Sequence, residues 1–479
     1  MASLLPRYIV IESSEGYFKP DGYVSYIRED GEDDGFLRYR EPQVTSPYAK
    51  FEVESSETEG QFHIRSCQNN KYWQRTFHYT DPWGYWIAAN SKKKGSKDSS
   101  TLFKFIPVAE NTFRIMHVES GYYVCWWRVD PDDQGYNPKF NWGLSSRNDY
   151  FDDGNSYLFK IIDWSSLMIL PRYVAFRGPN NKYLCLYKDS MPYYGSDEIG
   201  EETVAFEILP TNDGNIRIKS FKTGKFFRCV NSRWIWADDT STDNVDTFFR
   251  AVKFGDQKIG LIYLGNNNYC KRLTDEGYGN ALAAVATYAT NETEMMVEEP
   301  VLTREIYDVR YDLDNSRVYG EEVRVLAQFS ATNITDESSA REFMVGYTDI
   351  KISSWKTDLS LKLGTKTTMK FDVPFIFEGK VEMSAEVRSV VEWGEVSETI
   401  TNLEFVHNTV MAPMSEVTVN LVATKALCDV PFTYKQRDVL HDGSSVLSEV
   451  KGGTYYGSNY HSVQFVTKEE KLSSSDSIK

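Results

Sequence analysis

A run of alternating apolar and polar residues between Leu359 and Trp393 constrains the fold of this chain more than any other feature. Alternation with a period of two places one face of a strand in an apolar medium and the other face in water. The segment Pro374–Gly379 interrupts the run, so the pattern predicts a β-hairpin at about 359–393 with its turn in that segment. Each arm exceeds the roughly 9–11 residues that a tilted strand needs to cross a bilayer.

Two interpretations of this hairpin remain open. It fits one half-buried layer of an ordinary antiparallel sheet, and it also fits a hairpin that several chains contribute to a closed barrel. In the second interpretation, we expect the apolar tip Phe375, Ile376 and Phe377 to lead insertion. Val381 and Met383 then share a lipid-facing side of the returning arm.

The composition indicates an all-β protein. The 479 residues suggest about three domains, and the chain contains 31 Tyr, 27 Phe and 11 Trp but few long helical patterns. The formal net charge of -16 argues against binding to nucleic acid. Met1–Val10 does not have the pattern of a secretory signal, so we expect a cytoplasmic or nucleocytoplasmic location at synthesis.

Residues that carry catalysis or bind metals are sparse. The six cysteines and six histidines are scattered without metal-ligand spacing, and the cysteines are expected to be buried, reduced thiols. The acidic segment from Asp30 to Glu41 approaches a calcium loop, but strand-like sequence precedes it where an EF-hand needs a helix. We therefore expect no metal, no cofactor and no enzymatic activity. A glycosidase would need paired carboxylates in a cleft, for which the sequence gives no basis.

The first 300 residues contain internal repeats. Leu5-Pro-Arg-Tyr-Ile-Val10 recurs as Leu170-Pro-Arg-Tyr-Val-Ala175, which marks two tandem units. Within each unit, a motif of two strands and a polar turn recurs about three times, with a period of roughly 50 residues. Threefold strand repeats of this size predict a β-trefoil, whereas a propeller typically needs 4–8 blades.

These motifs resemble two known families. Phe159-Lys-Ile-Ile-Asp-Trp164 and Ile216-Arg-Ile-Lys-Ser220 are similar to the tandem pattern of the amaranthin family of plant agglutinins. Val373-Pro374 through Glu382, and Val417 through Thr433, resemble the aerolysin-like pore-forming module. The resemblance implies a first β-trefoil at 1–164, a second at 165–303, and an elongated antiparallel β domain at 304–479 that carries the insertion hairpin.

Two turns are candidates for sugar binding. A sugar site needs an aromatic face together with amide or carboxylate groups. The amaranthin resemblance implies that Tyr85 and Trp86 bind a galactose- or N-acetylgalactosamine-type glycan, at a site shared between two chains. Local chemistry adds Asn90 in the first unit, and Trp234 and Asp238 in the second. The alternative is that these aromatic side chains belong to the trefoil cores or to an interface.

Together, the two resemblances imply a lectin of plant defence that targets an aerolysin-like module to glycosylated membranes. There it is expected to form a homo-oligomer and a β-barrel pore. The alternative is an intracellular glycan-binding stress or defence lectin whose C-terminal module oligomerises without forming pores.

Overall fold

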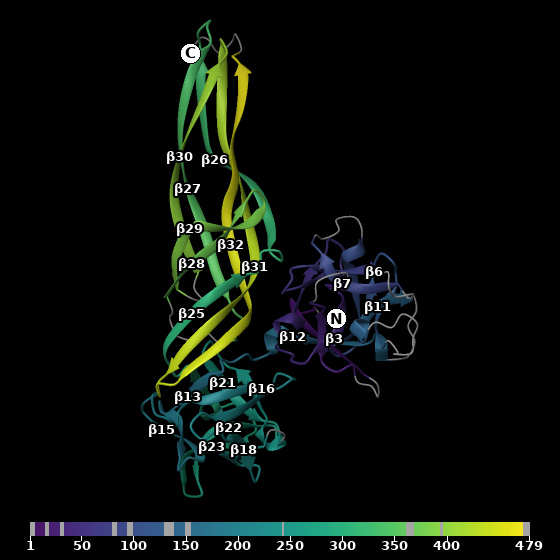
Figure 1. The fold of residues 1–479 in the computed structure, drawn as a ribbon, viewed down its shortest axis with the longest axis vertical. Helices are drawn as coiled ribbons and strands as arrows, with labels where there is room; N and C mark the ends of the chain where they lie inside the picture. Colours follow the sequence, from purple (N-terminus) through teal and green to yellow (C-terminus); the bar gives the residue numbers. More distant parts are fainter. Residues whose placement is uncertain are drawn as a thin grey trace. The chain divides into compact units, whose positions relative to one another are not determined.

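The computed structural model of the chain describes residues 5–14, 19–28, 33–78, 84–92, 99–128, 138–148, 155–241, 244–360, 368–392 and 396–472. Within these ranges the secondary structure consists of strands and three-residue 3-10 helices (Figure 1), so the predicted all-β fold is confirmed. The described helices are all too short to span a bilayer. The 3-10 helices are η1 (Pro47–Ala49), η2 (Ser99–Thr101), η3 (Pro138–Phe140), η4 (Asn155–Tyr157), η5 (Trp164–Ser166), η6 (Val245–Thr247) and η7 (Asn291–Thr293).

The first twelve strands form a β-trefoil. They are β1 (Tyr8–Ser13), β2 (Tyr23–Tyr26), β3 (Leu37–Glu41), β4 (Phe51–Ser55), β5 (Gln61–Ser66), β6 (Tyr72–Phe77), β7 (Tyr85–Ser91), β8 (Leu102–Ala109), β9 (Thr112–His117), β10 (Tyr123–Trp127), β11 (Gly143–Asn148) and β12 (Phe159–Asp163). Strands β1, β4, β5, β8, β9 and β12 pair in that order and close into a ring through β12 and β1. The hairpins β2–β3, β6–β7 and β10–β11 are joined to one another through β11.

The next twelve strands repeat this arrangement. They are β13 (Tyr173–Arg177), β14 (Tyr183–Tyr187), β15 (Met191–Ser196), β16 (Phe206–Pro210), β17 (Ile216–Ser220), β18 (Phe226–Val230), β19 (Trp234–Asp239), β20 (Phe249–Lys253), β21 (Lys258–Tyr263), β22 (Asn268–Asp275), β23 (Tyr278–Ala286) and β24 (Met295–Glu298). Strands β13, β16, β17, β20, β21 and β24 close the second ring. The three remaining hairpins join through β23.

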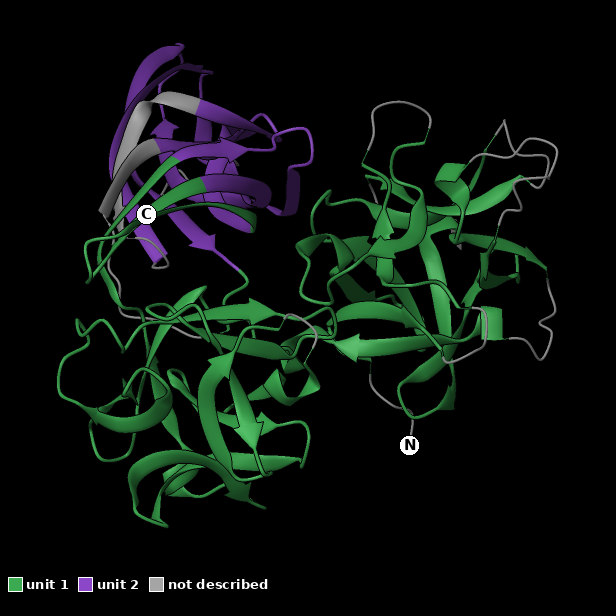
Figure 2. Cartoon of the chain, turned by 60° about the horizontal axis from the view of Figure 1, so that its bottom comes forward, with its two compact units in different colours: residues 1–307, 358–365, 435–452 green, residues 308–357, 366–434, 453–479 purple. Residues whose placement is uncertain are grey.

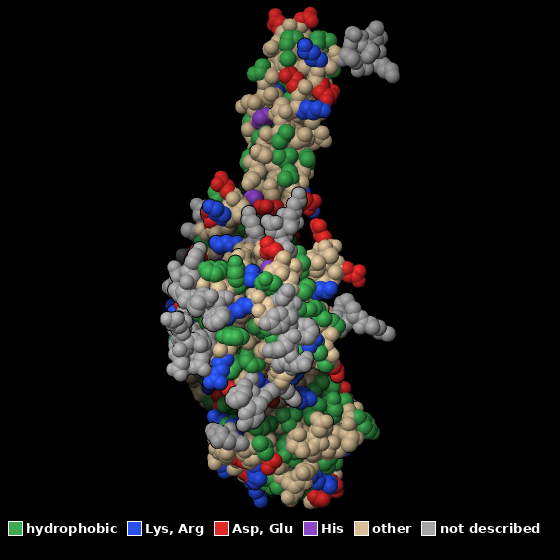
Figure 3. Space-filling view, turned by 90° about the vertical axis from the view of Figure 1, so that its right-hand side faces the viewer, with side chains coloured by type: hydrophobic (Ala, Val, Ile, Leu, Met, Phe, Trp, Pro, Cys, Tyr) green, Lys and Arg blue, Asp and Glu red, His purple; other side chains and the backbone are tan. Residues whose placement is uncertain are grey.

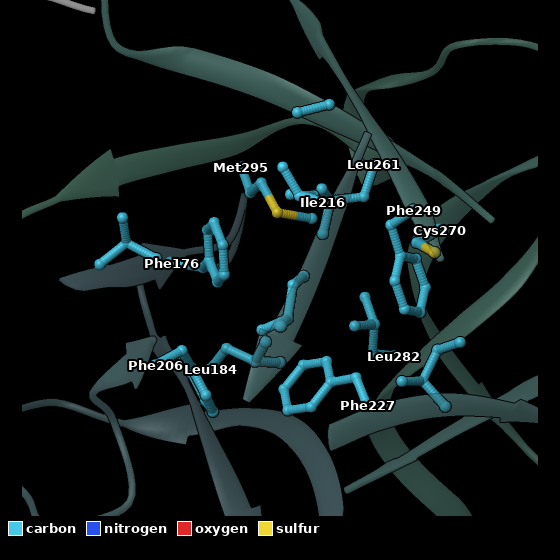
Figure 4. Close-up of a cluster of buried hydrophobic side chains, with 14 of the residues drawn as sticks. Phe176, Leu184, Phe206, Ile216, Phe227, Phe249, Leu261, Cys270, Leu282 and Met295 are labelled. Carbon is cyan, nitrogen blue, oxygen red and sulfur yellow. The ribbon is translucent and has the colours of Figure 1, made fainter. Parts of the chain in front are cut away.

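Each trefoil has its own apolar core, because one face of every barrel strand points to the barrel axis. In the second trefoil, side chains from different strands converge on one centre (Figure 4). Phe176, Phe206, Phe227 and Phe249 are completely buried there. The first core is built in the same way around Phe51, Trp73, Phe103 and Phe159.

An ion cluster also repeats between the trefoils. A glutamate that follows a buried phenylalanine binds two basic side chains, one of which comes from the repeated Leu-Pro-Arg-Tyr motif. The clusters are Glu52 with Arg7 and Arg65 in the first trefoil, and Glu207 with Arg172 and Lys219 in the second. The sequence repeat therefore corresponds to a repeated charge arrangement as well as to repeated strands.

Long antiparallel strands make up the rest of the chain. The sheet order is β25 (Val301–Tyr311), β31 (Ser415–Leu440), β32 (Ser445–Lys471), β27 (Ser339–Lys356) and β30 (Val396–Met411), and β26 (Arg317–Asn333) also pairs with β31. The hairpin strands β28 (Thr368–Phe377) and β29 (Lys380–Glu392) form a separate two-stranded sheet. These strands cover 368–392 of the predicted hairpin at 359–393. Leu359 and Ser360 lie outside the strands, and residues 361–367 and 393 lie outside the described ranges.

The chain divides into two compact units (Figure 2). The first unit comprises residues 1–307, 358–365 and 435–452, and the second comprises 308–357, 366–434 and 453–479. Three segments of the predicted third domain, 304–307, 358–365 and 435–452, thus belong to the unit that contains both trefoils. Within that unit, Arg304 is buried between Glu299 and Asp438 and donates hydrogen bonds of 2.6–3.0 Å to both carboxylates.

Candidate functional site

Strand β7 places Tyr85 and Trp86 in opposite environments. The Tyr85 side chain is 40% exposed, whereas Trp86 is only 1% exposed. The Trp86 ring packs 4.8 Å from the ring of Phe140, and its Nε1 has no hydrogen-bond partner among the described residues. Tertiary packing therefore buries the Trp86 ring within this chain, and its role in sugar binding stays a prediction.

Tyr85 instead belongs to an exposed aromatic and cationic patch. The Arg75 guanidinium carbon lies 3.6 Å from the Tyr85 ring centre and 5.1 Å from that of Tyr122. Arg75 Nε donates a 2.9 Å hydrogen bond to the carbonyl of Ser146, which fixes its position. Burial lowers the pKa of Arg75 from its ordinary value. Phe77, which is 46% exposed, packs edge-on against Tyr85 at 5.3 Å.

We call Arg75, Phe77, Tyr85 and Tyr122 the Tyr85 patch. It combines an accessible ring with a fixed hydrogen-bond donor, which is the chemistry that sugar hydroxyls and their apolar faces require. The sequence analysis missed Arg75 and Tyr122, since they lie on β6 and in the turn before β10. Asn90 lies apart from this ring surface, where its Nδ2 is 3.4 Å from Thr76 Oγ1 and its buried Oδ1 finds no partner in the described part of the chain.

The second-trefoil candidates occupy the equivalent hairpin. On β7, Ile87 and Ala89 pair with Arg75 and Trp73, and on β19, Ile235 and Ala237 pair with Cys229 and Phe227. This register makes Trp234 the counterpart of Trp86, and Asp238 the counterpart of Asn90. The predicted residues therefore lie in equivalent positions of two different trefoils, and the chain does not bring them together in one cluster.

Trp234 and Asp238 are both held by neighbours. Trp234 is 7% exposed and donates from Nε1 to Glu276 at 2.9 Å. Arg228 donates two hydrogen bonds of 2.6 and 3.0 Å to the Asp238 carboxylate. The more accessible aromatic surface here belongs to Trp236 and Tyr278, whose rings meet at right angles with centres 6.2 Å apart. Sequence reasoning missed Tyr278, because β22 and β23 bring it to this hairpin.

The β28–β29 hairpin differs from its prediction at the turn. The turn is only Glu378 and Gly379, both with positive φ (47° and 76°), which fits a two-residue hairpin turn. Phe375, Ile376 and Phe377 are strand residues and not an apolar tip. Gly379 adopts the left-handed backbone without a Cβ penalty, so the hairpin closes directly after Phe377. That these three residues lead insertion stays a prediction.

The apolar side chains near the turn do not lie on a single face of the hairpin. Ile376 pairs with Val381, and Pro374 pairs with Met383, so these four residues share one face. Ile376 is 1% exposed and Val381 is 8% exposed, whereas Phe377 on the other face is 49% exposed. Met383 is 38% exposed. A two-residue turn pairs odd with even positions, so the odd apolar residues of the two arms lie on opposite faces there.

Two side chains of β32 hold this hairpin. Asn459 Nδ2 donates to the carbonyl of Ile376 at 2.8 Å, and Ile376 N donates to Asn459 Oδ1 at 2.9 Å. Tyr455 Oη donates to the carbonyl of Pro374 at 2.8 Å. Asn459 thus bonds to the backbone of Ile376 as a neighbouring strand would.

The surface of the second unit carries exposed apolar side chains among polar ones, and Figure 3 shows this mixture. Met344 on β27 and Val406 on β30 are directly paired and are 68% and 56% exposed. Ile350 and Ile400 form a second such pair, 39% and 63% exposed. One face of the β27–β30 ribbon is therefore partly apolar and open to solvent.

The metal and cysteine predictions can be compared only where the structure describes the chain. No group of His, Cys, Asp or Glu side chains in the described ranges has the arrangement of a metal site. Asp33 of the acidic segment binds His78 and Lys139 instead, while residues 29–32 lie outside the described ranges. All six cysteines lie in the described ranges as thiols, and burial raises the pKa of the Cys229 thiol to about 11.

Comparison with known proteins identifies the trefoil region. A family model described as Agglutinin domain matches residues 5–163 and again 168–297. No curated protein matches the chain.

Among solved structures, the designed threefold-symmetric protein ThreeFoil is 13% identical, with a TM-score of 0.24, and covers 26% of this chain and 98% of its own. A mosquitocidal holotoxin is 11% identical, with a TM-score of 0.29, over 65% of this chain and 36% of the toxin. The lamprey immune protein is 15% identical, with a TM-score of 0.29, over 64% of this chain and 93% of its own. Scores this low support no argument about function.

Proposed function

The chain belongs to the agglutinin family of carbohydrate-binding lectin domains, and on that premise we propose that it is a membrane-targeted pore former. Its trefoils bind galactose- or N-acetylgalactosamine-type glycans on a membrane surface. Several chains then oligomerise, and each contributes the β28–β29 hairpin to a closed β-barrel. Closure is required because an open strand edge cannot face lipid.

The hairpin is the observation that carries this proposal. It forms a two-stranded sheet separate from the long-strand sheet, so it can leave without breaking a main ladder. Its strands of 10 and 13 residues reach the roughly 9–11 residues that a membrane strand needs. Three hydrogen bonds attach the hairpin to Asn459 and Tyr455. Breaking them costs less free energy than breaking a full β-ladder.

The Tyr85 patch supports the glycan part of the proposal. Its exposed ring and the donor groups of Arg75 suit the apolar face and the hydroxyls of a galactose-type sugar. The Trp236–Tyr278 surface on the second trefoil offers a comparable aromatic platform.

Dye release from vesicles tests the whole proposal. Full-length protein is added to vesicles that carry a galactose-terminated glycolipid and to matched vesicles without it. We expect release only from the first, with inhibition by free galactose or N-acetylgalactosamine. Binding without release would refute pore formation and support the non-pore-forming lectin. Release from both vesicle types would refute glycan targeting.

A further inference from the structure

The pairing register of the β28–β29 hairpin changes along its length, and this inference rests on the pore-forming function proposed above. At the end far from the turn, Met369 pairs with Val391 and Asp372 with Arg388. Near the turn, Pro374 pairs with Met383. One residue lies between positions 372 and 374 on β28, whereas four lie between positions 383 and 388 on β29, so β29 carries three surplus residues between the two registers.

A surplus of three changes which positions share a face, because side chains alternate with a period of two. Near the turn, Phe377 lies opposite Lys380 and Phe375 opposite Glu382. A lipid-facing strand surface must be apolar, and a charge near the bilayer midplane costs roughly 2–4 kcal/mol. The register near the turn therefore does not give the hairpin a continuous apolar face.

The hairpin would have a continuous apolar face if the register far from the turn continued to the turn. Phe377 would then lie opposite Met383, Phe375 opposite Ala385 and Val373 opposite Val387. These pairs continue the face on which positions 369 and 391 already pair. Positions 372 and 388 keep their present pairing. The loop grows to residues 378–382, and five-residue hairpin loops are common.

We propose that the resting hairpin is locked in a register that is unsuited to membranes, and that a three-residue slip of β29 near the turn makes it suitable. Asn459 provides the lock. Its buried amide holds the backbone of Ile376, and Ile376 and Val381 stay on the buried face while that contact lasts. A slip by three residues requires β29 to turn its other face toward the buried side. This rotation cannot happen while Val381 is packed beside Ile376.

Two cysteine pairs in the full-length chain report the two registers. Phe375→Cys with Glu382→Cys marks the resting register, and Phe377→Cys with Met383→Cys marks the slipped register. In the resting register, residues 377 and 383 are on opposite faces and three positions apart. A short bis-methanethiosulfonate linker joins only directly paired positions. Trypsin cuts after Lys380, so a linked pair appears by mass spectrometry as two joined peptides.

Each pair is prepared with native Asn459, with Asn459→Leu and with Ser458→Ala. Ser458 is the matched control, because its buried Oγ makes no hydrogen bond within the described residues. We expect the resting pair to link in the parent protein. Asn459→Leu, which removes both hydrogen bonds between this side chain and Ile376, should raise linking of the slipped pair about tenfold in solution, and Ser458→Ala should not change it.

Equal linking of the slipped pair with and without Asn459→Leu would overturn the lock. So would an equal rise with Ser458→Ala. Release from vesicles by protein whose resting pair is already linked would overturn the required slip. Absence of release by the parent protein would refute pore formation alone, because linking in solution is measured without a membrane.

Discussion

Replacing Trp86 and its neighbour Tyr85 separates fold stability from glycan binding. Trp86 is 1% exposed and packs against Phe140, with the Arg147 guanidinium 4.7 Å from its ring centre. Trp86→Ala therefore leaves a large cavity, for which a cost of about 3–5 kcal/mol is typical. For a domain of roughly 150 residues, each kcal/mol lowers the melting temperature by about 2–4 °C, so the first trefoil should melt roughly 6–20 °C lower.

Tyr85→Ala should behave in the opposite way. The ring is 40% exposed, so its loss should change stability by no more than about 0.5 kcal/mol. Loss of an aromatic contact with the sugar, typically about 0.5–1.5 kcal/mol, should weaken glycan binding by roughly threefold to tenfold.

Calorimetry of the full-length variants measures the first effect, and retention on immobilised galactose below the first transition measures the second. If Trp86→Ala melted at the wild-type temperature and lost sugar binding, the burial argument would be refuted. Trp86 would then be a ligand residue, as the family resemblance implied.

Three further predictions concern other parts of the chain. Arg304→Met leaves Glu299 and Asp438 buried without their partner, so hydrogen exchange in β25 should accelerate by the equivalent of about 3–5 kcal/mol; unchanged protection would refute this. Met383→Arg should abolish dye release while sparing sugar binding, and Glu382→Gln should keep release; lysis by Met383→Arg at the wild-type rate would exclude this hairpin. Burial alone raises the pKa of Glu207, but hydrogen bonds from Lys219 and Arg172 outweigh it and lower that pKa. The stability that Glu207 contributes is therefore present above pH about 4.3 and lost as the pH falls through its folded value. Glu207→Gln should flatten the acid-induced fall in melting temperature, and an unchanged fall would contradict this.

The trefoils could be predicted because their signal is local and repeated. Strand, turn and strand recur along the sequence, and the Leu-Pro-Arg-Tyr motif marks where each unit starts. The residues that fill each barrel occupy every second position in these motifs, as Phe51 and Val53 in the first trefoil and Phe206 and Ile208 in the second illustrate. Burial of Trp86 was not predictable in this way, since neighbouring strand positions Tyr85 and Trp86 are both aromatic and packing decides which one faces the interior.

The sequence predicts a hairpin here but does not predict its turn or its register. Alternation indicates two strands, whereas the register depends on a two-residue turn and on contacts distant in sequence. Asn459 lies 83 residues from Ile376 and carries no local mark of its role. The Arg304–Asp438 pair spans 134 residues and was invisible for the same reason. Long-range polar contacts of this kind need the folded topology.

The equivalence of the two trefoils has a consequence for how the lectin part discriminates between surfaces. The Tyr85 patch and the Trp236–Tyr278 surface are built around equivalent hairpins of the two trefoils, so a single chain presents two related but chemically different aromatic surfaces. Two tethered sites raise each other's effective concentration, often to the millimolar range. The overall affinity of the chain for a dense glycan layer is then much higher than the affinity of either surface for a free sugar. Under the proposed function, valency within one chain makes membrane attachment depend on glycan density as well as on glycan identity.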